Sequence, residues 1–151
     1  MKILVCTDGS VHSKKALEKA SIIAEGSNFE EVAIIHVDEE KLDFSAMPLL
    51  KASITSENMA KLSRLREEHV KERKIILNDA LKVFEEKKIK ARAILKEGHP
   101  AHTIVSVASD EGFDMIVIGS RGFSGLEKAF LGSVSNAVTQ EAKNCCVVIV
   151  K

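Results

Sequence analysis

Apolar residues along this chain gather into short continuous runs that are separated by stretches with helical spacing. Continuous apolar runs are typical of strands that are buried on both faces of a parallel sheet. Stretches whose apolar positions recur every three or four residues predict helices that cover those faces. The alternation therefore predicts one α/β domain over residues 1–151, with helices on both faces of an open sheet. The predicted strands span residues 2–7, 32–37, 89–96, 115–118 and 145–150.

Helix signals lie between these strands. Apolar positions on one helical face begin near residues 16, 101 and 134, and Pro100 suits the first turn of the second of these helices. Residues 56–87 contain no Gly or Pro and are rich in Glu, Lys, Arg and Leu, which favours one long helix. Charge around residues 69–74 interrupts its apolar stripe, and we interpret that part as a solvated face. The residues of this helix expected to face the core are Leu62, Leu65, Ile76, Ala80 and Val83.

Composition argues against two classes of partner. Acidic and basic residues balance at 22 each, and aromatic residues make up only 4% of the chain, so we expect no nucleic-acid partner. No apolar segment approaches the roughly 18–20 residues that span a membrane, and the short apolar N-terminus runs directly into Asp8. We therefore expect no membrane association and a cytoplasmic location. Cys6, Cys145 and Cys146 lie in apolar surroundings and are expected to be buried.

A glycine-rich segment between a strand and a helix carries the clearest chemical signal. Gly119 and Gly122 follow the apolar run of residues 115–118, and Gly132-Ser133 comes after nine further residues, where helical spacing begins. Glycines let backbone amides approach a ligand closely, and a helix N-terminus offers unpaired N–H groups to an anion. The segment has neither the Gly-Lys-Ser/Thr of a P-loop nor the Gly-x-Gly of a dinucleotide site. It therefore predicts another kind of phosphate site; the alternative is a flexible connector with Ser133 as helix N-cap.

This glycine spacing resembles the nucleotide-binding signature of the universal stress protein family. The resemblance extends to the first strand and its acidic loop, from Ile3 to Ser10, and to a Gly-x-Pro turn at residues 98–100. It implies an open five-stranded parallel sheet in the order 3-2-1-4-5, a Rossmann-like fold of the adenine nucleotide alpha hydrolase type. It also implies a homodimer, commonly built through the last strand. One branch of the family binds ATP, and the intact glycine signature resembles that branch.

The resemblance assigns candidate binding residues to the carboxyl ends of the strands, where open parallel sheets hold their ligands. It implies that Asp8 lies near the nucleoside, where a carboxylate can accept hydrogen bonds from ribose or hold a phosphate-bound metal ion. The alternative role for Asp8 is a turn or N-cap residue. Backbone groups of Val37 are implied to pair with the adenine edge, and Gly98 to lie near the ribose, while Arg121 can pair with phosphate or point to water. The full predicted set is Asp8, Gly9, Ser10, Val37, Gly98, Gly119, Arg121, Gly122, Gly132, Ser133, Val134 and Ser135.

We therefore predict an ATP-binding regulatory protein of the stress response, in which nucleotide occupancy modulates a homodimer that acts on a downstream protein. Because no P-loop lysine is present, Mg2+ is expected to reduce the repulsion between the phosphates, with Asp8 as a candidate ligand. A slow ATPase or an adenylyl-transferring enzyme is the alternative, although no clear general base accompanies Asp8. An AMP-binding protein and an interaction protein without nucleotide are further alternatives.

Overall fold

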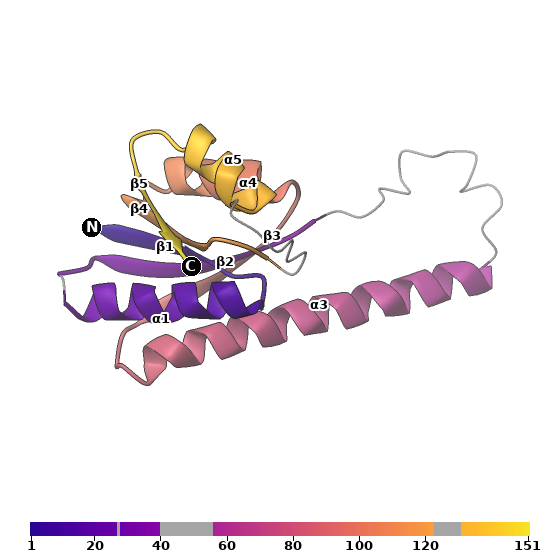
Figure 1. Cartoon of the computed structure of the whole chain (residues 1–151). Helices are drawn as coiled ribbons and strands as arrows, with labels where there is room; N and C mark the ends of the chain where they lie inside the picture. The colour runs from indigo at the N-terminus through magenta and orange to yellow at the C-terminus, as the bar shows by residue number, and fades with distance from the viewer. Residues whose placement is uncertain (27, 40–55, 123–130) are drawn as a thin grey trace.

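The computed structural model describes residues 1–26, 28–39, 56–122 and 131–151, and in these ranges the chain forms a five-stranded parallel sheet. The strand order is β3-β2-β1-β4-β5, which confirms the order implied by the sequence (Figure 1). β1 lies at the centre, and the chain crosses to the other side of it between β3 and β4. The strands are β1 (Lys2–Cys6), β2 (Glu31–Asp38), β3 (Ala91–Glu97), β4 (Met115–Gly119) and β5 (Cys146–Val150).

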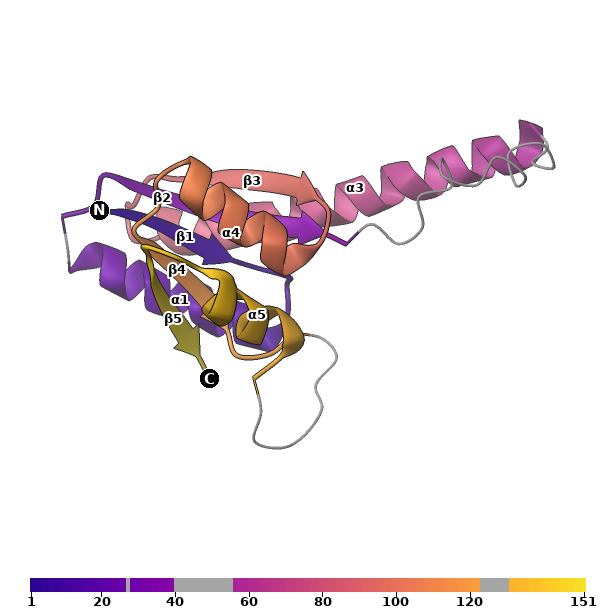
Figure 2. The same ribbon diagram turned by 90° about the horizontal axis from the view of Figure 1, so that it is seen from above.

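Helices cover both faces of the sheet, as predicted. α1 (Val11–Glu25) and α3 (Ser56–Glu85) lie on one face, and α4 (Pro100–Asp110) and α5 (Ser133–Glu141) lie on the other (Figures 1 and 2). Successive side chains of a strand point to opposite faces, so each strand feeds two cores. In β1, Ile3 and Val5 join the core beneath α1 and α3. Leu4 and Cys6 join the core beneath α4 and α5.

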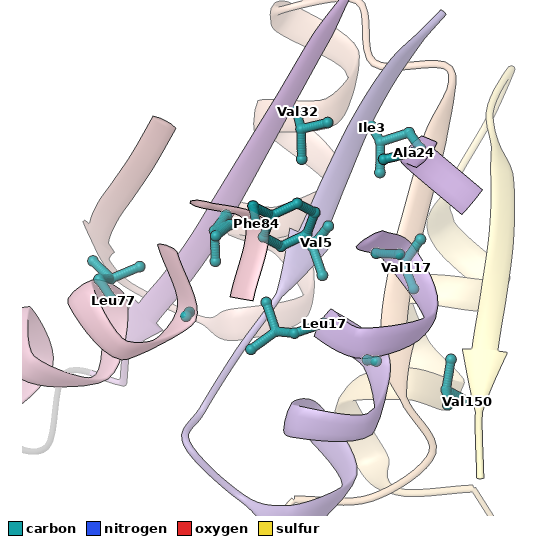
Figure 3. Close-up of a cluster of buried hydrophobic side chains, with 13 residues drawn as sticks. Ile3, Val5, Leu17, Ala24, Val32, Leu77, Phe84, Val117 and Val150 are labelled. Atoms are coloured by element: carbon teal, nitrogen blue, oxygen red, sulfur yellow. The ribbon is translucent and has the colours of Figure 1, made fainter. Parts of the chain in front are cut away.

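Phe84 anchors the C-terminal half of α3 to the sheet. Its ring is fully buried and belongs to the same core as Leu17 of α1 and Val5 of β1 (Figure 3). Burying a side chain of this size stabilises the fold by about 1.5–3 kcal/mol. This contact fixes where α3 lies on the sheet, and hence which of its residues reach the carboxyl edge.

The N-terminal half of α3 extends past the end of the sheet (Figure 1). Leu65 in that half is 45% exposed, whereas Leu77 and Phe84 in the other half are buried. The prediction that Leu65 faces the core is wrong because no sheet lies beneath that part of the helix. Of the other predicted core positions, Ala80 is buried, Ile76 and Val83 are half-buried, and the side chain of Leu62 lies outside the described part of the chain.

The cysteines differ in exposure. Cys6 is buried as predicted, and burial raises the pKa of its thiol, so that it stays protonated. Cys145 is half-buried and Cys146 is exposed, so the predicted burial of Cys146 is wrong. Cys146 begins an edge strand, where a neighbour lies on one side only among the described strands. In the described ranges, no helix combines the length and the apolar character needed to cross a membrane.

Candidate functional site

The loop after β1 holds Asp8 in a defined position. Gly9 has a φ of 85°, a left-handed conformation that favours glycine, and a Cβ there would lie 3.2 Å from Cδ1 of Ile76. Oδ1 of Asp8 accepts a hydrogen bond from the Ser10 N–H at 2.9 Å. The Ser10 hydroxyl is the N-cap of α1 and accepts from the Ser13 N–H at 3.3 Å. One Asp8 oxygen and the Ser10 hydroxyl are thus engaged within the protein, and Oδ2 of Asp8 is the oxygen that faces away from these bonds.

Two glycines bring the end of β4 against the start of the chain. A Cβ at Gly119 would lie 2.7 Å from the carbonyl carbon of His12, so β4 and α1 approach each other where only glycine fits. A Cβ at Gly122 would lie 2.7 Å from Oδ2 of Asp8. Oδ2 of Asp8 therefore faces the backbone of the glycine loop. The acidic loop and the glycine loop, predicted to belong to one site, are in contact.

The glycine loop leads to the N-terminus of α5. The helix begins at Ser133, as its spacing predicts, and its N-cap is Gly132, so Ser133 is not the N-cap that the alternative interpretation assigned. Gly132 has no side chain to accept a hydrogen bond, and no side chain of the described residues caps this helix. The first N–H groups of a helix have no partner within it. Here those groups, from Ser133 and Val134 onward, lie beside the glycine loop, because Gly132 contacts the backbone of Ser120 and Arg121.

Ser120 and Ser135 close the base of the glycine loop. The Ser120 carbonyl accepts hydrogen bonds from the Gly132 N–H at 2.8 Å and from the Ser135 hydroxyl at 3.0 Å. Ser135 is only 2% exposed, and its hydroxyl also lies 3.0 Å from the Gly132 carbonyl. The hydroxyl predicted to bind a ligand is therefore already engaged in holding the loop. Arg121 is half-buried in the loop, and residues 123–130 lie outside the described ranges.

Val37 and Gly98 lie at the carboxyl ends of the neighbouring strands β2 and β3. The Gly98 N–H donates to the Asp38 carbonyl at 3.0 Å, which extends the β2–β3 pairing beyond the strands. Gly98 has a φ of 137°, and a Cβ there would lie 3.0 Å from the hydroxyl oxygen of Thr103. The side chain of Val37 packs against the core beneath α4, so what Val37 can offer a ligand is its backbone.

All the predicted residues therefore gather at one edge of the sheet. The strand order reverses between the neighbouring strands β1 and β4, and open α/β sheets bind ligands in the crevice outside such a switch point. Asp8 and Gly122 meet at this point. Val37 and Gly98 lie at the ends of β2 and β3, on the other side of β1 from β4.

Arg73 is a residue of this edge that sequence reasoning missed. It reaches from α3 to Asp38 at the end of β2, with Nε and one terminal nitrogen each 3.1 Å from Oδ1. Its side chain is 27% exposed, so the interpretation of residues 69–74 as a solvated face is wrong at Arg73. No local pattern marks this ion pair, because the two residues come from separate elements.

His36 is the second missed residue. It is 5% exposed, and its Nδ1 lies 2.8 Å from the Thr7 carbonyl oxygen. Since a carbonyl only accepts, Nδ1 carries the proton and donates. Burial lowers the pKa of the imidazole, the Arg73 cation acts in the same direction, and the bond to Thr7 opposes them. The signal in the sequence that could have pointed to His36 is a histidine in the middle of an apolar run.

Comparison with known proteins assigns this chain to a family. The sequence profile of the Universal stress protein family matches residues 1–151. The chain belongs to this family. Universal stress protein YxiE of Bacillus subtilis (strain 168) is 38% identical over 150 residues, which cover 99% of this chain and 98% of that relative. The solved structure of MJ0577 from Methanocaldococcus jannaschii matches with a TM-score of 0.79 at 30% identity, covering 99% of this chain and 94% of that chain.

Two more distant universal stress proteins were solved with adenine nucleotides. The protein from Archaeoglobus fulgidus in complex with dAMP matches with a TM-score of 0.66 at 21% identity, covering 100% of this chain and 98% of that chain. A universal stress protein in complex with cAMP matches with a TM-score of 0.67 at 23% identity, covering 100% and 96%. At these identities the likeness establishes a shared fold.

Proposed function

We propose that this universal stress protein binds one adenine nucleotide, ATP in particular, at the carboxyl edge of its sheet and uses that occupancy to regulate a homodimer. The observation that carries the proposal is the contact between Asp8 and Gly122. It joins a carboxylate suited to a nucleoside to a glycine loop suited to phosphate. The dAMP and cAMP complexes of two distant relatives support adenine as the base.

The nucleoside half of the proposed site consists of Asp8, Val37 and Gly98. Oδ2 of Asp8 accepts hydrogen bonds from ribose hydroxyls in this proposal, because its other oxygen is held by the Ser10 N–H. Val37 contributes backbone N–H and carbonyl groups to the edge of the base. Gly98 lets the ribose approach the backbone after β3, where a side chain would already meet Thr103.

The phosphate half consists of the glycine loop and the N-terminus of α5. Gly119, Gly122 and Gly132 keep the loop free of side chains near the backbone amides. The uncapped N–H groups of Ser133 and Val134 and the positive end of the helix dipole favour an anion there. Arg121 supplies a positive charge within the loop.

Asp8 also suits a Mg2+ ion that is shared with the phosphates. Mg2+ prefers oxygen ligands and is commonly held by one or two carboxylates together with substrate phosphates. Oδ2 of Asp8 faces the glycine loop, where the phosphates lie in this proposal. Among the described residues, no group of three or more His, Cys, Asp or Glu side chains could hold a metal by itself. We therefore expect Mg2+ to bind together with ATP.

The partner in the proposed homodimer is a second copy of the chain, paired through β5. β5 is an edge strand, and its side chains Val147, Val148 and Ile149 are only half-buried. Apolar side chains on an edge strand favour pairing with another chain.

Native mass spectrometry of the full chain, purified from its host, tests both parts of the proposal. The expected species is a dimer in which each protomer carries the mass of one adenine nucleotide. The mass identifies ATP or AMP. A chain that carries no nucleotide, and acquires none when about 1 mM ATP and Mg2+ are added, would contradict nucleotide binding.

A further inference from the structure

β1 and β2 separate at the candidate site, and His36 lies where they part. The parallel pairing of these strands ends at Cys6 and Ile35, and one more bond joins the Thr7 N–H to the Ile35 carbonyl at 2.9 Å. In a parallel sheet, residues two apart on one strand direct their backbone groups to the same neighbouring strand. The next bond of this ladder would therefore join the Val37 N–H to the Thr7 carbonyl.

The Thr7 carbonyl instead accepts its hydrogen bond from Nδ1–H of His36, at 2.8 Å. The side chain of His36 thus takes the acceptor that the backbone of Val37 would use. No backbone hydrogen bond between described residues engages the Val37 N–H at this position. The backbone of the neighbouring Asp38 faces the other way, toward β3, and its carbonyl accepts a hydrogen bond from the Gly98 N–H.

We propose that His36 is a positioning residue of the nucleotide site: by occupying the Thr7 carbonyl, it leaves the N–H and carbonyl of Val37 available to the edge of an adenine base. This inference rests on the proposed function. A residue in a strand presents its N–H and carbonyl side by side. On its major-groove edge adenine offers an adjacent acceptor, N7, and donor, the N6 amino group, whereas guanine offers two acceptors, N7 and O6. Pairing of the freed Val37 backbone with that edge therefore selects adenine over guanine.

The same hydrogen bond sets the direction of Asp8. The Thr7 carbonyl belongs to the peptide group that begins Asp8, so His36 fixes that peptide plane. The Thr7 hydroxyl, which lies 3.3 Å from the Gly9 N–H, holds the next part of the loop. Burial keeps the imidazole of His36 in place. The residue is 5% exposed and lies on the sheet face that α1 and α3 cover. One side chain thus positions two of the three contacts of the nucleoside half, Val37 and Asp8.

His36→Asn and His36→Leu form a matched pair for testing this role. Asn and Leu have nearly the same shape, and only Asn can donate a hydrogen bond from about the position of Nδ1. In isothermal titration with AMP, we expect His36→Asn to stay within about threefold of the wild-type Kd and His36→Leu to weaken it by about tenfold or more. Ile34→Val, on the same face of β2, is the control that lowers stability without touching Thr7, and its Kd is expected to be unchanged.

Amide hydrogen exchange, followed by NMR, provides a readout that does not require nucleotide. In the nucleotide-free wild type, we expect the Val37 amide to exchange at least about tenfold faster than the Ile35 amide, and to slow when AMP is added. In His36→Leu the Thr7 carbonyl is released, and Val37 is expected to be protected without nucleotide.

Two results would overturn the role of His36. One is equal protection of Val37 and Ile35 in the nucleotide-free wild type, and the other is an equal loss of affinity in His36→Asn and His36→Leu. If His36→Leu fails to fold, the wild-type exchange rates and the Kd of His36→Asn still decide the question. A wild type that binds no nucleotide contradicts the proposed function, whereas the exchange rate of Val37 still reports on His36.

Discussion

Oδ2 of Asp8 faces the backbone of Gly122 so closely that a side chain at position 122 would begin 2.7 Å from it. Asp8 follows β1 and Gly122 follows β4, which are neighbours in the sheet although they are far apart in the sequence. Parallel strands end at the same edge, so the two loops meet there. One carboxylate and one glycine loop thus form the centre of the candidate site.

Gly122→Ala should weaken nucleotide binding more than it weakens the fold. The added methyl group meets the end of the flexible Asp8 side chain, which can move aside, but then leaves its binding position. We expect the Kd for ATP, measured by titration calorimetry, to rise about tenfold or more with little change in Tm. Gly26→Ala is the matched control, because its methyl group meets nothing nearer than 3.7 Å. An unchanged Kd in Gly122→Ala would exclude Asp8 from the site.

Gly119→Ala, by contrast, should weaken the fold more than it weakens nucleotide binding. Its methyl group would lie 2.7 Å from the carbonyl carbon and 2.8 Å from the carbonyl oxygen of His12, and backbone atoms cannot move aside easily. We expect the free energy of unfolding, from urea denaturation, to fall by about 1–3 kcal/mol. A loss below about 0.5 kcal/mol would contradict the close approach of β4 and α1.

Stability should fall as the pH drops below about 7 because of His36. The ordinary pKa of histidine is 6.5, and burial lowers the pKa of His36 in the folded state. Below pH 6.5 the unfolded chain therefore binds more protons than the folded chain, and the free energy of unfolding decreases until the pH reaches the folded-state pKa. Above both pKa values His36 is neutral in the folded and the unfolded chain, and this loss of stability is absent.

Urea denaturation across this pH range measures that slope, and His36→Asn should flatten it. The hydrogen bond from Arg92 lowers the pKa of Glu31 from 4.5, so this carboxylate acts at lower pH and does not obscure the result. An equally steep slope in His36→Asn would show that His36 is not the responsible group.

Val147→Pro should separate the proposed homodimer. The Cys146 N–H donates to Asp114 and the Val150 carbonyl accepts from Ser120, so these residues bond toward β4. By alternation, the N–H of Val147 points outward from β5. Proline removes that donor and is tolerated on edge strands. In sedimentation analysis we expect Val147→Pro to be monomeric and Val147→Ala, which keeps the N–H, to be dimeric; a dimeric Val147→Pro would contradict pairing through β5.

Local patterns were sufficient to predict most elements of this fold. Continuous apolar runs predicted the strands, and the spacing of Gly119, Gly122 and Gly132 predicted the loop that meets Asp8. The order of the strands came from the family resemblance. These features were predictable because each depends on residues that are close together in the chain or on a recurring motif.

The features that were missed depend on contacts between distant elements. Leu65 continues the helical pattern of α3, but its exposure is decided by where the helix leaves the sheet. Arg73 lies in a charged stretch, and only the fold brings it to Asp38. His36 is conspicuous within its strand, yet its acceptor at Thr7 is determined by where β1 and β2 part. Ser133 suits an N-cap by residue type, but the helix already begins there, and Gly132 occupies the cap position.

Titration of the wild-type chain with ATP and Mg2+ in an isothermal calorimeter tests the central claim most directly. At a protein concentration of about 100 μM, the account predicts a saturable heat with one nucleotide per protomer and a sub-millimolar Kd. It also predicts a much weaker response to GTP in the same buffer. The absence of any binding heat with ATP and Mg2+ under these conditions would contradict the proposal that Asp8 and the glycine loop form a nucleotide site.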